Sequence, residues 1–172
     1  GKAFVSRNPL LPKEFFTRPG LDPFIIDINK RADYSLLTNR SLYTVRVASF
    51  RGDSTLNVSN KAIKNHPVTN KLVQAAEKAT RLVSALRSQG KDAYVFHDRH
   101  ESIVTIGSFS SVGTQQADGK IHLDARILQI MQTYGAERRT LPGGSQYGLT
   151  PKVLNGVPFD VQPIPVMVPR AR

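Results

Sequence analysis

The densest group of chemically active side chains is the run His97-Asp98-Arg99-His100-Glu101. Imidazole and carboxylate groups can bind a metal ion, but the ligands must converge, and neighbours within one turn rarely do so without a further ligand from elsewhere. The chain has no cysteine that could complete such a set. We therefore interpret the run as a polar hairpin tip, and we expect neither a metal ion nor a cofactor.

A second chemical candidate is the group of hydroxyls Ser108, Ser110 and Ser111. Nucleophilic catalysis needs a serine beside a histidine and a carboxylate, and no G-x-S-x-G motif is present. The run GGSQYG at 143–148 misses that motif at its last position, and it lacks the Gly-Lys-Ser/Thr of a phosphate loop. We expect a binding or structural protein with no catalytic residues, rather than an enzyme.

The composition is that of one domain with extensions. The 172 residues are 40% hydrophobic and carry a net charge of +11, which favours an anionic partner. The cations are spread along the chain instead of forming a block, and this argues against a dedicated nucleic-acid surface. No run of about 18 apolar residues is present, so we expect no transmembrane segment. Because the chain starts at Gly1, we expect it to be a processed or excised product.

The hydrophobic periodicity predicts four strands and two helices. Strands are expected at 43–50, 92–97, 102–109 and 159–168, and helices at 69–90 and 122–134. Pro163 and Pro165 lie two residues apart, a spacing that an edge strand tolerates and a central strand does not. The stretches 51–68 and 138–158 predict loops, the second with a small hairpin at Asn155-Gly156.

This order predicts an α+β fold, a ferredoxin-like split β-α-β sandwich. Its four-stranded antiparallel sheet would have the strand order 4-1-3-2, with two helices on one face. The repeat VRVASF at 45–50 and VTIGSF at 104–109 would supply the two central strands. We divide the chain into an extended N-terminal arm at 1–42, a domain at 43–168 with a loop insertion at 138–157, and a tail at 169–172.

Residues 43–136, with the C-terminal strand, resemble a SPOR (sporulation-related repeat) domain. The resemblance rests on the first strand YTVRVASF, the helix and second strand AAEKATRLVSALRSQGKDAYVF, and the third strand SIVTIGSFSS. It implies a module of the bacterial cell envelope, in the periplasm or at the cell surface, that binds peptidoglycan glycan strands. The chain departs from the family at Arg46, where the family has Gln, in the long loop 51–68, and at 110–121.

The expected binding surface is the outer face of the sheet. Strand alternation turns Val45, Val47, Val104 and Ile106 toward the helices and leaves small and polar residues on the other face. A shallow floor of this kind, with a nearby aromatic ring, suits an extended glycan. The predicted glycan-binding residues are Tyr43, Thr44, Arg46, Ala48, Tyr94, Thr105 and Gly107, and Ile103 shares their face.

Two alternatives stay open at this point. The arms at 1–42 or 138–172 could cover the outer face, so that nothing binds there. The protein could also be a structural subunit of a larger assembly or filament, in which residues 1–42 extend from the core and dock on a homo- or hetero-oligomeric partner. An RNA-binding RRM shares the strand order, but it needs aromatic residues on the central strands. Phe50 and Phe109 have the outward parity but lie at the strand ends.

Overall fold

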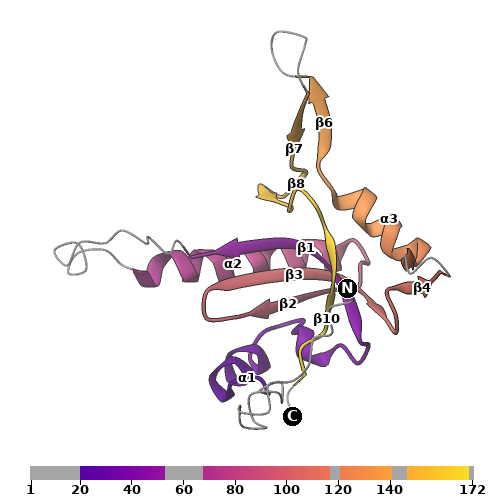
Figure 1. The fold of residues 1–172 in the computed structure, drawn as a ribbon. Coiled ribbons are helices and arrows are strands. Elements are labelled where there is room, and N and C mark those ends of the chain that lie inside the picture. Colours follow the sequence, from indigo (N-terminus) through magenta and orange to yellow (C-terminus); the bar gives the residue numbers. More distant parts are fainter. Residues whose placement is uncertain (1–19, 53–67, 117–120, 141–146, 171–172) are drawn as a thin grey trace, which may run out of the picture.

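The computed structural model describes residues 20–52, 68–116, 121–140 and 147–170. Within these ranges the chain is an α+β protein with a four-stranded antiparallel sheet and three α-helices (Figure 1). The strands of the sheet are β1 (Tyr43–Arg51), β2 (Ala93–His97), β3 (Glu101–Phe109) and β10 (Ile164–Met167), in the order β10-β1-β3-β2. The four predicted strands and their order are confirmed, and the Pro-containing strand does lie on an edge.

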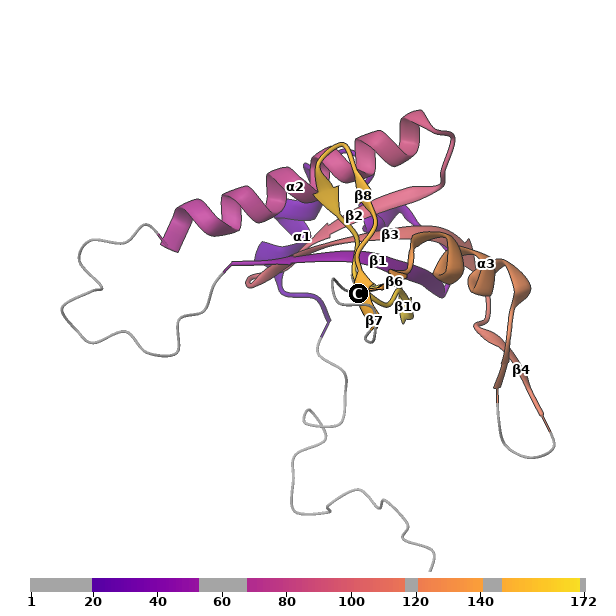
Figure 2. The same cartoon turned by 90° about the horizontal axis from the view of Figure 1, so that it is seen from above.

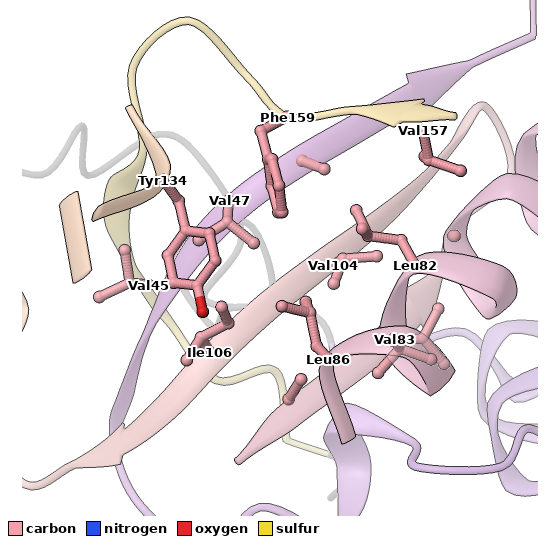
Figure 3. Close-up of a cluster of buried hydrophobic side chains, with 14 of the residues drawn as sticks. Val45, Val47, Leu82, Val83, Leu86, Val104, Ile106, Tyr134, Val157 and Phe159 are labelled. Carbon is pink, nitrogen blue, oxygen red and sulfur yellow. The ribbon is translucent and has the colours of Figure 1, made fainter. Parts of the chain in front are cut away.

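Two helices cover one face of the sheet, α2 (Val68–Ser88) and α3 (Ala125–Tyr134). Their apolar residues meet those of β1 and β3 in the main core, where Leu82 and Leu86 of α2 have no exposed surface (Figure 3). The predicted inward residues Val45, Val47, Val104 and Ile106 all belong to this core. Helix α3, which was predicted to begin at residue 122, begins at Ala125. The Asp124 carboxylate caps it by accepting a hydrogen bond from the Arg126 amide at 2.8 Å.

A β-bulge in β1 changes which side chains face the core. Arg46 pairs with Thr105 and Ala48 pairs with Val104, so β1 has one residue more than β3 between these pairs. An extra residue interrupts the alternation of faces. Ala48 is therefore fully buried in the main core, and Phe50 packs against the core. The prediction that these two residues face outward is wrong for this reason.

A second bulge lies in β3, between the pairs Tyr43 with Phe109 and Val45 with Ile106. It contains Gly107, whose φ is +86°, and a Cβ atom at this position would lie 2.5 Å from the Phe109 ring. The bulge turns Phe109 into the core, where it is 5% exposed. Both copies of the repeat thus place a small residue at a bulge, two positions before a core phenylalanine.

The N-terminal segment corrects the prediction of an extended arm. Residues 20–42 contain α1 (Pro23–Lys30) and the 3₁₀-helix η2 (Leu36–Thr38), while residues 1–19 lie outside the described ranges. Pro23 occupies the first turn of α1, where its missing N–H costs nothing. Asp22 caps this helix by accepting from the Phe24 amide at 2.8 Å. Pro23 therefore starts a short helix in a segment that we expected to be extended.

The region between the core elements contains three hairpins. The predicted hairpin at Asn155-Gly156 is confirmed: β8 (Val153–Leu154) and β9 (Val157–Pro158) flank it, with φ of 49° and 75° at the two turn residues. The remaining strands were not predicted. They form the pair β4 (Gly113–Gln115) with β5 (Ile121–Leu123) and the pair β6 (Glu137–Thr140) with β7 (Tyr147–Thr150). β6 and β7 fall largely in the expected loop 138–158, and β5 overlaps the start of the helix expected at 122–134. Both pairs project from the body (Figures 1 and 2).

Among the helices in the described ranges, none has both the length and the apolar character that crossing a membrane requires.

The Gly107 bulge gives a first prediction. Gly107→Ala should lower the free energy of unfolding by about 3 kcal/mol, because the new methyl group is strained at positive φ and displaces the Phe109 ring. Gly90→Ala is the matched control, since its φ of +73° gives the same strain but nothing lies within 4 Å of the added Cβ. It should cost about 1 kcal/mol. Denaturant unfolding of the two variants measures both values, and equal losses would contradict the role of the Phe109 contact.

Candidate functional site

The outer face of the sheet, where we expected the glycan, is covered. Thr44, Ala48 and Thr105 have no exposed surface. The Thr44 hydroxyl donates to the carbonyl of Ile106 at 3.2 Å, and Ala48 points into the core. These three residues cannot touch a ligand in this structure. The predicted site is thus wrong for them, and the alternative of a covered face is the one observed for residues 20–42.

The cover is a second hydrophobic core on the outer face. Its buried members are Ile25 of α1, Leu36 of η2, Phe96 of β2 and Val168 after β10. Phe96 follows Val95, which points into the main core, so the two neighbours lie on opposite faces of the sheet. The N-terminal segment therefore packs on the face that α2 and α3 leave free.

The cover is also held by hydrogen bonds along the outer edge of β2. The side-chain amide of Asn29, which is fully buried, donates to the His97 carbonyl at 2.7 Å and accepts from the His97 amide at 2.8 Å. One step along the edge, the amide of Val95 donates to the carbonyl of Tyr34 at 2.9 Å. The edge strand is thereby paired, and this closes the route by which another strand could add to β2.

The C-terminal segment forms hydrogen bonds with residues 39–42, at the end of the cover that leads into β1. The guanidinium of Arg170 donates to the carbonyls of Asn39, Arg40 and Ser41 at 2.9, 2.7 and 2.6 Å. The amide of Val168 donates to the carbonyl of Leu42 at 2.9 Å. These bonds fix the cover from both ends, so we treat it as a permanent layer of the domain.

Arg46 is engaged within its own chain. Its Nε atom lies 3.5 Å from a carboxylate oxygen of Asp160, and its side chain is 26% exposed. Asp160 also accepts from the amide and the hydroxyl of Ser49 at 2.9 and 3.0 Å. β10 pairs with β1 only as far as Arg46, and the Asp160 carboxylate bonds to the edge of β1 at Ser49, past the end of β10. Arg46 lies beside this carboxylate. The other predicted residues divide: Tyr43 packs against the main core, Gly107 forms the bulge, and Tyr94 reaches the surface.

Tyr94 belongs to a polar and aromatic surface group beside β2, which we call the tyrosine rim: Tyr34, Arg87, Asp92, Tyr94 and Ser108. The guanidinium carbon of Arg87 lies 5.0 Å from the Tyr34 ring centroid and 4.7 Å from that of Tyr94. Asp92 accepts from the Ser108 hydroxyl at 2.7 Å and lies 3.2 Å from an Arg87 nitrogen. Rings, hydroxyls and a carboxylate together have the chemistry for binding a sugar.

The polar run from His97 to Glu101 joins β2 to β3 as a hairpin tip. Among the described residues, no group of three His, Asp or Glu side chains converges. His97 Nδ1 lies 2.9 Å from the Ser102 hydroxyl, and Arg99 pairs with Asp22 at 2.7 Å. Ser108, one of the three hydroxyl residues singled out above, donates to Asp92 and lies 3.2 Å from the Tyr94 hydroxyl. The contacts of His97 and Arg99 hold the hairpin tip in place, and those of Ser108 belong to the tyrosine rim.

Two of the three most exposed large apolar side chains in the described ranges lie on β7, in a stretch that we expected to be loop. Tyr147 and Leu149 of β7 are 70% and 60% exposed, and every residue of β6 is exposed. The register of the β6–β7 hairpin places Tyr147 and Leu149 on one face with Arg138 and Thr140. A sequence signal did exist: Gly143 and Gly144 lie between two short runs, a pattern typical of a hairpin.

The half-buried imidazole of His97 predicts a pH dependence of stability. Burial lowers the pKa of His97 below its ordinary value of 6.5, so the unfolded chain takes up the proton at a higher pH than the folded one. The free energy of unfolding should therefore be highest above that value and fall as the pH drops below it. Hydrogen bonds from Arg99 and Arg126 lower the pKa values of Asp22 and Asp124. The stability that these carboxylates contribute is lost only at lower pH, when they take up protons.

The test is chemical denaturation between about pH 7.5 and pH 5. His97→Gln should flatten the dependence in this interval, whereas the control His100→Gln, at an exposed position, should leave it unchanged. An unaltered slope in the His97 variant would contradict the assignment.

The chain matches no protein-family model, no curated protein and no solved structure. A proposal for its function must therefore rest on its own residues and their geometry.

Proposed function

We propose that this protein is a non-catalytic structural subunit, with a ferredoxin-like, SPOR-like core as a scaffold and the β6–β7 hairpin as its connector to a partner. The observation that carries the proposal is the exposure of Tyr147 and Leu149 on a hairpin that has no core of its own. Following the resemblance, we place the subunit in the bacterial cell envelope, in the periplasm or at the surface.

The energetic argument concerns the hairpin. A two-stranded hairpin is at best marginally stable alone in water. This one projects from the body, and its two most exposed apolar side chains share a face with Arg138 (Figure 1). Tyr and Arg are typical of the residues that dominate protein interfaces. A partner that buried this face would stabilise the hairpin and gain a directional contact.

The cover supports the same proposal. A module that presents its sheet to a polymer needs an accessible floor, and here the floor is filled by α1 and η2. Several exposed arginines are also neutralised locally: Arg31 with Asp27, Arg51 with Glu101, Arg99 with Asp22, Arg126 with Asp124, and Arg139 with Glu137. Local pairing reduces the attraction that the net charge would exert on nucleic acid.

The test replaces β6 and β7 by a short Gly-Ser turn. The core should keep its melting temperature, because the hairpin contributes nothing to either hydrophobic core. Association should be lost, as measured by sedimentation of the purified protein and by cross-linking in the source cells. Replacing β4 and β5, the other projecting hairpin, is the matched control. An intact chain that is monomeric when purified and forms no cross-linked species in cells would refute the proposal.

A second candidate function is glycan binding at the tyrosine rim. The observation that favours it is the joint exposure of Tyr34, at 47%, and Asp92, whose side chain is also 47% exposed, beside the Tyr94 hydroxyl. Tyr34 has a φ of 57°, a conformation that costs a non-glycine residue energy and is often associated with a function.

Co-sedimentation with isolated peptidoglycan sacculi tests this second function. The protein should pellet with sacculi, and more strongly after an amidase has removed the stem peptides. Tyr34→Ala should reduce pelleting, whereas Tyr147→Ala, on the remote hairpin, should not. Equal pelleting with an unrelated insoluble polysaccharide would reduce the interaction to charge alone, and no pelleting would exclude it.

A further inference from the structure

The two outer edges of the β6–β7 hairpin differ in charge. β6 contributes Glu137, Arg138 and Arg139, whereas β7, with the sequence Tyr-Gly-Leu-Thr, has no charged residue and no proline. Natural proteins protect exposed edge strands with charges, prolines or a covering segment. Within the part of the chain that the structure describes, the edge of β6 carries such protection and the edge of β7 does not. An unprotected edge of this kind is a template for pairing with another strand.

The charged side chains of the hairpin strands all belong to β6. The carboxylate of Glu137 lies 3.4 Å from Arg139 and 3.8 Å from Lys152, on the face away from Tyr147. The guanidinium of Arg138 lies 5.8 Å from the Tyr147 ring centroid, within the range of a cation–π contact. Two of these three cations, Arg138 and Arg139, belong to β6, and Lys152 follows β7.

We infer that β7 pairs antiparallel with β7 of a second copy of this chain. The inference rests on the proposed function and names the partner. An uncharged strand can pair with itself without placing like charges opposite one another, whereas β6 would set arginine near arginine. The hairpins also project from the body, which separates the two positively charged cores (Figure 1). Screening by salt weakens their repulsion over such separations.

The pairing register follows from the faces of the hairpin. Paired residues must lie on the same face if the apolar surface is to continue across the new sheet. With Gly148 at the two-fold axis, Tyr147 of one copy lies opposite Leu149 of the other, twice. This register joins the two most exposed apolar side chains of β7 in cross-strand pairs. The contact is isologous, so it yields a closed dimer with a four-stranded sheet rather than a filament.

The absence of cysteine from the chain allows a direct test. A Gly148→Cys variant should form a disulfide-linked dimer on mild oxidation, because residues at such an axis bring their Cα atoms within disulfide range. The matched control is Arg139→Cys. Arg139 pairs with Gly148 across the hairpin, so it lies at the same height on the opposite edge. This control should stay monomeric.

Light scattering supplies the second measurement. The native chain should show a concentration-dependent dimer, and Leu149→Lys should weaken dimerisation by about tenfold or more, by adding the edge charge that β7 lacks. The control Ile121→Lys, on β5, should leave it unchanged. A dimer that is cross-linked through Arg139→Cys, or weakened only by Ile121→Lys, would overturn the pairing while leaving the proposed function intact. A native chain that stays monomeric would overturn the pairing, and hairpin-dependent cross-links to another protein in cells would then still support the proposed function.

Discussion

The hydrogen bonds along the outer edge of β2 determine which surfaces of the domain remain accessible to a partner. The side-chain amide of Asn29 supplies a donor and an acceptor to the backbone of His97, as a neighbouring strand would. This anchors α1 over the sheet and lets Ile25 and Leu36 fill the outer face. Without the anchor, the sheet would expose an unpaired edge and an apolar surface. With it, the floor is buried, and the surface available for interactions moves to the rim and the hairpins.

The sequence predicted the sheet because burial on a helix-covered face imposes a regular pattern. Val45 and Val47 alternate with polar neighbours, and Leu82 and Leu86 lie one helical turn apart, so local periodicity reveals both elements. The strand order then follows from the sequence of elements and the edge prolines. These features depend on short-range patterns, which a single sequence carries.

The remaining features depend on contacts between distant segments. Ala48 faces the core only because β3 pairs with one residue fewer than β1 supplies, and alternation within β1 alone cannot reveal this. The helix within the N-terminal cover was not predicted, although the position of Pro23 directly after Asp22 suits a helix start. The β6–β7 hairpin was missed because a strand pair that buries nothing has no alternation of buried and exposed residues to detect. The predictions of an open glycan-binding face and of an extended arm were both wrong, because the N-terminal segment packs on that face.

The Arg170 contacts have a consequence for folding during synthesis. The bond from Arg170 to the Asn39 carbonyl joins residues that lie 131 positions apart, and β10 pairs with β1 across a similar separation. A ribosome therefore releases β1 long before the strand that completes its edge exists. Contacts between such distant residues slow folding, and an unpaired central strand is prone to aggregate meanwhile. Asp160, which bonds to the same edge of β1, also arrives late. We therefore expect the sheet to close only when synthesis of this domain is almost finished, and nascent chains to need protection until then.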